Sequence, residues 1–409
     1  MKFEKLGNVF PVIRNGANIK QDKVADGYPI TRIETIADGT VDLSRVGYAS
    51  IHDESFSDFY LQENDILMSH INSVSHLGKV ALVNSINEKV IHGMNLLCLK
   101  ADESKVHPMY SFYFLKSPIF RSKIKRITKK SVNQASFNIS NLKEIEIPLP
   151  PLPDQLHIAN LLSKAENLIA QRKESIRLLD EFLKSTFLEM FCDNPETEEW
   201  DEVKFEELAE KKKASMRSGP FGSSLLHGEF TETGDVKVLG IDNVVTNRFT
   251  WKKNRCITSE KFKELKRYQV FPNDVLISIM ATLGRTAVVP KDIPLCINSK
   301  HLAAITLNKE IANPYFVAYA FHSHPLIVRQ MSNNVKGAIM DGLNLTIIRK
   351  IKLKQPPIEL QNKFGEVFEK TEVLKTHYQQ SLQELENLYG SLSQKAFRGE
   401  LEIKKATAV

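Results

Sequence analysis

The residues from 116 to 130 carry seven basic side chains and no acidic one. A cationic run of this kind either contacts the phosphates of a nucleic acid or lies on a solvated helix face with no specific partner. We keep both interpretations open. The candidate phosphate contacts within this run are Lys123, Lys125, Arg126, Lys129 and Lys130.

A second candidate segment begins at 211–213, where three lysines precede a Gly-Pro-Phe-Gly loop. Glycine allows a backbone to approach another group closely, so such a loop can bring N–H groups and small hydroxyls to a phosphate or a base edge. The alternative is an ordinary hairpin connection. The candidate residues are Lys211, Lys212, Arg217, Ser218, Gly219, Phe221 and Ser223.

Motifs for catalysis are missing from the sequence. It contains no GxGxxG, GxxxxGK[ST], HExxH or GxSxG pattern. His322 and His324 have no cysteine or carboxylate cluster beside them, and we interpret them as ordinary surface or turn histidines. The sequence therefore predicts a non-catalytic recognition protein that holds no metal or cofactor.

The elements that must position these residues are dominated by residues 150–191, which begin with prolines and then run about forty residues without glycine. Apolar residues recur in this segment every seven positions, which predicts a long coiled-coil helix that needs a partner helix. The main track is Leu162, Ile169, Ile176, Leu183 and Met190.

The partner is predicted in the same chain, 206 residues later. Pro356–Pro357 is followed by Gln361 as Pro150–Pro151 is followed by Gln155, and a second heptad helix follows. Other segments repeat at offsets between 202 and 209. In particular, Lys79 and Arg285 follow Gly78 and Gly284, so both copies keep a cation there, and we count both as candidate DNA contacts.

Composition sets wider limits. The chain has 409 residues, a formal net charge of +6 and a pI near 8.9, which permits a polyanionic partner without requiring one. Four scattered cysteines predict reduced thiols. No signal-like segment and no run of 18 apolar residues is found, so we expect a soluble cytoplasmic protein without membrane contact.

Together these patterns predict an α+β fold: two similar globular domains separated by two long antiparallel coiled-coil helices, related by a pseudo-twofold internal repeat. The expected boundaries are 1–150 for the first domain, 151–192 for the first helix, 193–355 for the second domain, 356–400 for the second helix and 401–409 for a tail. Within the first domain, residues 108–120 are expected to form a helix rich in aromatic side chains.

The sequence also resembles the specificity subunits of type I restriction-modification enzymes. The resemblance covers nearly the whole chain and is carried by the duplicated Pro-Pro-x-x-x-Gln with its long helix. Further matching segments begin at Asp26, Asn64, Asn138, Ser218 and Asn344. Cys192 stands where the family pattern favours glycine.

This resemblance implies a DNA-recognition subunit with two target recognition domains that read a bipartite gapped site. Such subunits direct adenine methylation and restriction by partner subunits, the modification (methyltransferase) and restriction (translocase/nuclease) subunits. S-adenosylmethionine, ATP and Mg²⁺ are then expected on the partners and none on this chain. The alternative is a stand-alone two-domain sequence-specific DNA-binding or adaptor protein.

Overall fold

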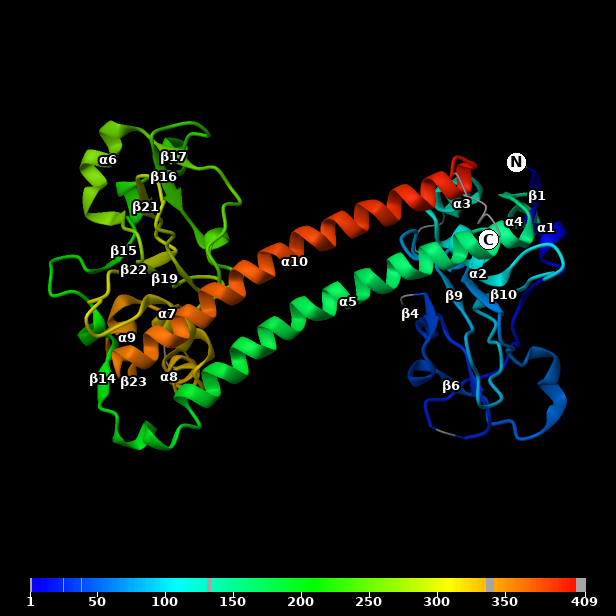
Figure 1. Ribbon diagram of the computed structural model, residues 1–409, viewed down its shortest axis with the longest axis horizontal. Helices are drawn as coiled ribbons and strands as arrows, with labels where there is room; N and C mark the ends of the chain where they lie inside the picture. Colours follow the sequence, from blue (N-terminus) through cyan, green and yellow to red (C-terminus); the bar gives the residue numbers. More distant parts are fainter. Residues whose placement is uncertain (1, 25, 38, 131–133, 336–341, 402–409) are drawn as a thin grey trace, which may run out of the picture. The chain divides into compact units, whose positions relative to one another are not determined.

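A computed structural model describes residues 2–401 of the chain, apart from 25, 38, 131–133 and 336–341. The chain divides into two compact units (Figure 1). The first unit contains the residues up to 173 and those from 380 onward, and the second contains 174–379. Two long helices, α5 (Leu152–Phe191) and α10 (Ile358–Arg398), each contribute one half to each unit. The compact units therefore do not coincide with continuous stretches of sequence.

The first unit is built on a six-stranded sheet. Its neighbours pair antiparallel, except that β5 pairs with β9 in parallel. The sheet order is β2 (Val12–Asn15), β10 (Leu96–Lys100), β7 (Ile66–Ser69), β9 (Val80–Leu82), β5 (Thr40–Val41) and β4 (Ile36–Ala37).

Shorter strands surround this sheet. They form the pair β1 (Phe3–Lys5) with β13 (Glu146–Pro148), the pair β3 (Pro29–Ile30) with β6 (Gly47–Tyr48), and the ladder β11 (Lys129–Lys130), β12 (Ala135–Ser136) and β8 (Ile71–Asn72). The helices besides α5 and α10 are α1 (Leu6–Val9), α2 (Pro108–Lys116), α3 (Pro118–Ile127) and α4 (Ile139–Lys143).

The helix expected over residues 108–120 is in fact two helices, so that prediction is corrected. Ser117 separates α2 from α3 with an extended backbone (ψ 153°). Proline at 118 disfavours helical geometry at the residue before it and cannot donate a helical hydrogen bond. The Ser117 side chain instead accepts a hydrogen bond from the Phe120 amide at 3.2 Å and caps the new helix.

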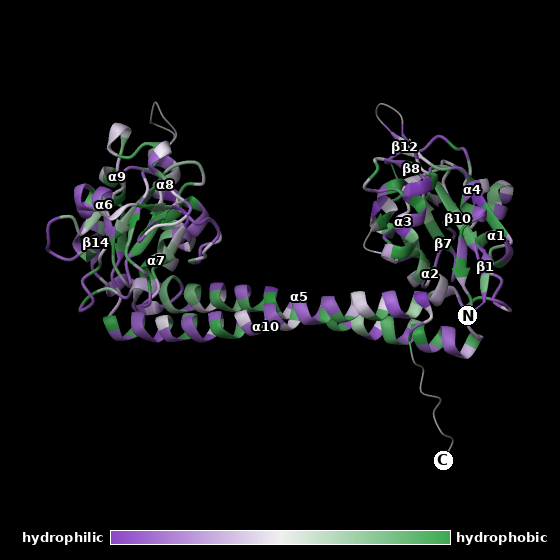
Figure 2. Cartoon of the chain, turned by 90° about the horizontal axis from the view of Figure 1, so that it is seen from above, coloured by the Kyte–Doolittle hydropathy of each residue, from purple (hydrophilic) through white to green (hydrophobic). Residues whose placement is uncertain are grey.

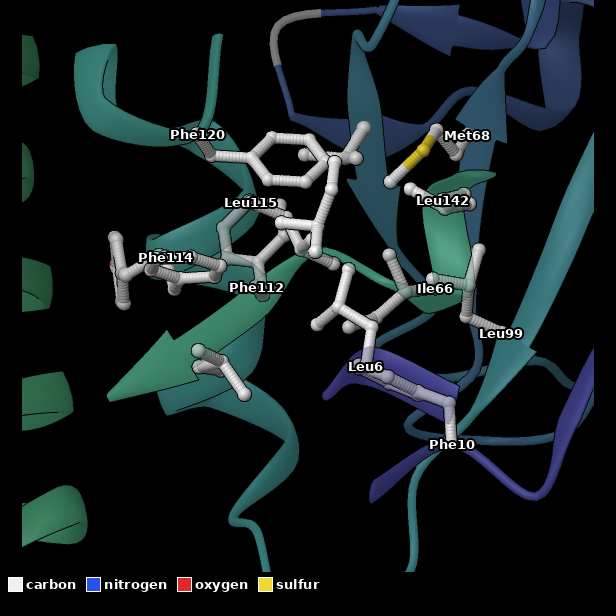
Figure 3. Packing of buried hydrophobic residues seen from close by; sticks show 14 of the residues in the cluster. Leu6, Phe10, Ile66, Met68, Leu99, Phe112, Phe114, Leu115, Phe120 and Leu142 are labelled. Carbon is white, nitrogen blue, oxygen red and sulfur yellow. The ribbon is translucent and has the colours of Figure 1, made fainter. Parts of the chain in front are cut away.

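The core of the first unit lies where α2, α3 and α4 cover β7 and β10 (Figure 3). Phe112, Phe114 and Phe120 pack there with Ile66 and Met68. Long helices join the same core: α5 contributes Ile158 and Leu162, and the end of α10 contributes Phe397. The Phe397 ring meets that of Phe114 edge to face at 5.5 Å, so this end of α10 is an integral part of the domain.

The second unit contains two four-stranded sheets and one strand pair. The first sheet is β15 (Met216–Ser218), β22 (Leu302–Ile305), β19 (Val275–Ser278) and β20 (Thr286–Val288). The second is β17 (Cys256–Ile257), β16 (Val236–Leu239), β21 (Cys296–Asn298) and β18 (Gln269–Val270), in which β16 and β21 are parallel. The pair is β14 (Glu202–Lys204) with β23 (Lys352–Lys354).

The helices of this unit are α6 (Ser259–Leu265), α7 (Pro314–Ser323), α8 (Pro325–Val335) and α9 (Leu345–Lys350). An aromatic cluster fastens them to the long helices. Phe191 of α5 lies 4.6 Å from Phe316 of α7, and Phe364 of α10 lies 5.6 Å from Phe191, measured between ring centroids. Both long helices therefore contribute to this core as well.

The repeat predicted from the sequence is visible in the backbone. Asn64 and Asn273 both adopt positive φ, at 70° and 65°, two residues before the corresponding strands β7 and β19. Gly78 and Gly284 adopt φ of 70° and 74° before β9 and β20. Asparagine and glycine tolerate this left-handed region better than other residues, so both copies retain the residue type that the turn requires.

Gln155 and Gln361 explain why the Pro-Pro-x-x-x-Gln motif is duplicated. The Gln155 side chain accepts from the His107 amide at 2.8 Å and donates to the carbonyls of Lys105 and Pro150 at 3.1 and 2.8 Å. The Gln361 side chain accepts from the Asn313 amide at 2.9 Å and donates to the carbonyls of Ile311 and Pro356 at 3.1 and 2.8 Å. Each glutamine thus joins the first turn of a long helix to the segment that starts α2 or α7.

The long helices run antiparallel within each unit. In the first, Lys173 of α5 pairs with Glu386 of α10 at 2.9 Å, and in the second, Asp180 of α5 pairs with Lys375 of α10. Figure 2 shows apolar and polar residues alternating along both helices. Of the main heptad track, Leu162 and Leu183 are buried, whereas Ile169, Ile176 and Met190 are half-buried.

All four cysteines are free thiols, as expected from their scattered positions in the sequence. None of the helices in the described part of the chain combines the length and the apolarity that crossing a bilayer requires.

Candidate nucleic-acid interface

The basic run of the first unit divides into exposed and engaged side chains. Lys125 and Arg126 are exposed at the end of α3, and Lys129 and Lys130 are exposed on β11. Lys123 is only half-exposed, because its ammonium group donates a hydrogen bond to the Glu146 carbonyl at 3.0 Å. Four of these five candidates are therefore presented to solvent, while Lys123 holds α3 against β13.

Lys79 and Arg285 occupy corresponding places, as the repeat predicted. Each follows its positive-φ glycine and leads directly into β9 or β20. Lys79 is half-exposed and Arg285 is exposed. Neither side chain forms an ion pair with another residue that the structure describes, so both charges are available to an anion.

Lys211 and Lys212 are exposed ahead of β15. Lys212 lies 3.0 Å from Glu210, a contact between exposed groups of low energetic value. A phosphate could replace the Glu210 carboxylate at little cost.

Arg217 is not on the surface. Its side chain is 5% exposed and pairs with the fully buried carboxylate of Asp274. Its guanidinium also donates to the Gln269 carbonyl at 2.7 Å and to the Thr306 hydroxyl at 3.0 Å. These internal partners favour a structural role for Arg217 over the DNA contact expected from the sequence.

Gly219 also has a structural reason to be glycine. A Cβ atom at this position would lie 2.2 Å from the Ser299 carbonyl carbon, so only glycine permits the backbones to approach. Ser218 is half-buried beside it. Phe221 and Ser223 are exposed, with Gly222 between them at φ +60° and open space around it. Of the loop residues, only this tip is available to a large ligand.

One exposed group of the second unit was not among the candidate contacts. Trp251 is 51% exposed and is followed by Lys252 and Lys253, both exposed. An exposed indole beside two ammonium groups can stack on a base while the cations contact phosphates. The basic residues were recognisable in the sequence, but the exposure of the tryptophan was not.

Of the two histidines expected on the surface or in a turn, His324 lies at the turn between α7 and α8 but is buried, and His322 is half-buried at the end of α7. His324 is 8% exposed, and His322 Nδ1 lies 2.9 Å from both the Thr286 hydroxyl and the Ala318 carbonyl. Burial lowers the pKa of His322 to about 4. Packing of α7 onto β20 covers this side chain. Local sequence composition does not reveal such a contact, because the two elements are far apart in the chain.

The arrangement presents cations and a few hydroxyls, which contact phosphates, and exposed loops, which can reach base edges. Among the described residues, no group of three histidine, cysteine, aspartate or glutamate side chains could hold a metal ion.

Comparisons with known proteins place the chain among DNA-specificity proteins. The family model described as the type I restriction modification DNA specificity domain matches residues 1–178 and again 197–387. The chain is 33% identical over 371 residues to the putative type I restriction enzyme MjaX specificity subunit of Methanocaldococcus jannaschii, covering 87% of this chain and 83% of that protein. It is 21% identical over 427 residues to the type I restriction enzyme EcoBI specificity subunit of Escherichia coli, covering 95% and 84%.

Solved structures share its fold. The S subunit of a type I restriction-modification system from M. genitalium superposes with a TM-score of 0.58 at 18% identity, covering 98% of this chain and 96% of the other. A chain from a study of complex assembly and conformational transition of the type I R-M system gives a TM-score of 0.57 at 16% identity, with 98% of both chains covered.

Proposed function

Since this chain belongs to the type I restriction-modification DNA specificity family, we propose that it reads a bipartite DNA site with one half-site for each α+β domain. The chain is the DNA-recognition subunit of such a system. The observation that carries the proposal is the duplication itself. Both halves of the sequence contain one matching strand order, β2-β10-β7-β9 in the first unit and β15-β22-β19-β20 in the second. Each half also starts a long helix through the same glutamine anchor.

Two domains with one fold and different loops can read two different short sequences. The exposed tip at Phe221 and Ser223 and the Trp251 group belong to the second unit, whereas the exposed cations on α3 and β11 belong to the first. Base-edge contacts provide sequence discrimination, and phosphate contacts fix the register on the duplex. Because the two units present different groups, we expect a DNA site with two dissimilar halves and a spacer whose sequence is not recognised.

The subunit itself is proposed to be non-catalytic. It would direct adenine methylation by modification subunits and cleavage by restriction subunits, and those partners would hold S-adenosylmethionine, ATP and Mg²⁺. Exposed apolar residues on the long helices supply a surface for such partners. Leu168, Leu178 and Phe182 of α5 are each about half-exposed, at 50%, 49% and 49%.

Sequencing of methylated adenines in cells that carry this gene tests the proposal. We expect one methylated motif of two short parts with a gap between them, and loss of that motif when the gene is deleted. A modification protein should co-purify with the chain. Methylation that is unchanged by the deletion would contradict the proposal, and tight sequence-specific binding by the isolated chain would favour the stand-alone adaptor instead.

A further inference from the structure

A hollow of about 1040 Å³ lies in the first unit between the edge of its sheet and the α5 helix. Its wall is formed by the segment 33–45, β8 and β9 with the turn between them, the end of α2, the start of α3 and the part of α5 around residues 166–173. Five cationic side chains and two carboxylates line it. The cations are Arg45, Lys79, Lys116, Arg121 and Lys173.

Three of these cations have internal or neighbouring partners. Lys116 pairs with Glu166, Lys173 with Glu386 and Arg45 with Asp42. The side chains of Lys79 and Arg121 have no hydrogen bond or ion pair with another described residue. The hollow therefore has an excess of positive charge, and two of its cations are uncompensated.

The corresponding place in the second unit has different chemistry. The repeat matches Lys79 with Arg285, Lys116 with His322 and Arg121 with Val328, since α2 corresponds to α7 and α3 to α8. Only Arg285 keeps a charge, because burial lowers the pKa of His322 to about 4. Arg285 and Val328 line a smaller hollow with Leu283, Met331 and Leu343.

A second hollow of this unit lies between β20, α7 and α10, and the charges that line it compensate one another. Its lining has two cations, Arg248 and Lys375, and two carboxylates, Glu369 and Glu372. Arg248 Nε lies 2.6 Å from Glu372, its NH2 group lies 2.7 Å from Asp180, and Lys375 pairs with Asp180. These ion pairs hold the loop that contains Arg248 to α5 and α10.

We propose that the hollow of the first unit binds backbone phosphates of the DNA through Lys79 and Arg121, and that the second unit has no equivalent grip. This inference rests on the proposed DNA-recognition function and adds an asymmetry to it. A phosphate that enters the hollow meets two cations whose charges are not already compensated, and each such contact releases counterions from the duplex.

The test uses the full chain in its complex with the modification subunits and a fluorescently labelled mixed-sequence duplex. The logarithm of the binding constant is measured against the logarithm of salt concentration. For Lys79→Gln with Arg121→Gln, we expect the slope to become shallower by about two, because each lost phosphate contact reduces the magnitude of the slope by roughly 0.9. Glutamine keeps length and helix propensity while removing the charge.

Two comparison variants locate the effect. Lys20→Gln with Lys23→Gln removes two exposed charges of the same unit outside the hollow and should leave the slope unchanged. Arg248→Gln in the second-unit hollow should also leave it unchanged. A slope that is unaltered in the Lys79/Arg121 variant, or equally altered in the Lys20/Lys23 variant, overturns the inference. Failure of the unsubstituted complex to bind the duplex would instead count against the proposed function.

Discussion

The guanidinium of Arg217 lies against the carboxylate of Asp274 inside the second unit, with both side chains almost completely removed from solvent. Asp274 also accepts from the Thr306 hydroxyl at 2.6 Å and from the Phe271 amide at 2.8 Å. Burial raises the pKa of Asp274, and the positive charge of Arg217 opposes that rise. The pair therefore joins β15 to the residue that precedes β19, and each buried charge depends on the other.

Removing one partner of this pair should be much worse than removing both. We expect Arg217→Met to destabilise the second unit by about 3–5 kcal/mol, because Asp274 is left buried without its counter-charge. Arg217→Met with Asp274→Leu should recover most of that loss. Urea unfolding followed by tryptophan fluorescence isolates this unit, since both tryptophans, Trp200 and Trp251, lie in it. Equal destabilisation by the single and double variants would contradict the pairing.

The glutamine anchor of the second unit should contribute measurably to its stability. Gln361→Ala removes three hydrogen bonds and leaves the part-buried Asn313 amide unsatisfied, so a loss of about 2–3 kcal/mol is expected in the tryptophan-monitored transition. Gln355→Ala, which removes one hydrogen bond to the Ile311 carbonyl, provides the comparison and should cost about 1 kcal/mol. A smaller loss for Gln361→Ala than for Gln355→Ala would refute the anchoring role.

The exposed cations of the first unit should contribute to DNA binding independently of sequence. Alanine is introduced singly at Lys125, Arg126, Lys129 and Lys130. Each substitution that removes a phosphate contact should make the slope of log binding constant against log salt concentration shallower by about one. Lys123→Ala should change the salt dependence less, because the Lys123 ammonium group donates a hydrogen bond to the Glu146 carbonyl. An equal decrease at Lys123 and Lys125 would show that this contact does not hold the side chain.

Stability should fall on acidification because of the buried histidines. The pKa of His322 is lowered to about 4, so between pH 6.5 and 4 the unfolded chain binds a proton that the folded chain does not. The stability present above pH 6.5 is then lost as pH falls toward 4, by roughly 1–2 kcal/mol between pH 6.5 and 5.

His322→Gln should flatten this pH dependence in the tryptophan-monitored transition of the second unit. His92 of the first unit, whose pKa is also lowered to about 4 by burial, is the matched control. His92→Gln should leave the pH dependence of that transition unchanged. A steep dependence that persists in His322→Gln would exclude His322 as its source.

The length of the long helices should set the spacer of the DNA site. Four residues inserted into α5 after Lys173 and four into α10 after Gln379 add about 6 Å to each helix, which corresponds to roughly one to two base pairs. Methylation sequencing should then reveal the same half-sites with a longer gap. Insertion into one helix alone shifts the apolar seam and should abolish methylation. An unchanged gap after insertion into both helices would refute the idea that helix length sets the spacer.

Local patterns in the sequence were sufficient to predict the repeat, the α+β class and the two long helices. Heptad spacing at Leu162 and Leu183 depends only on the helical period. The repeat follows from comparing segments such as Gly78–Lys79 and Gly284–Arg285. Both signals depend on residue types and spacing alone, so they can be recognised without the tertiary structure.

Tertiary structure decided which charges are available. Lys116 pairs with Glu166, fifty positions away, and Arg217 is buried with Asp274, fifty-seven positions away. No local pattern reports these pairs, because a cation's partner is set by which strands and helices pack together. For the same reason the candidate contacts separated into exposed residues, such as Lys125 and Lys211, and structural ones only when the two units had formed.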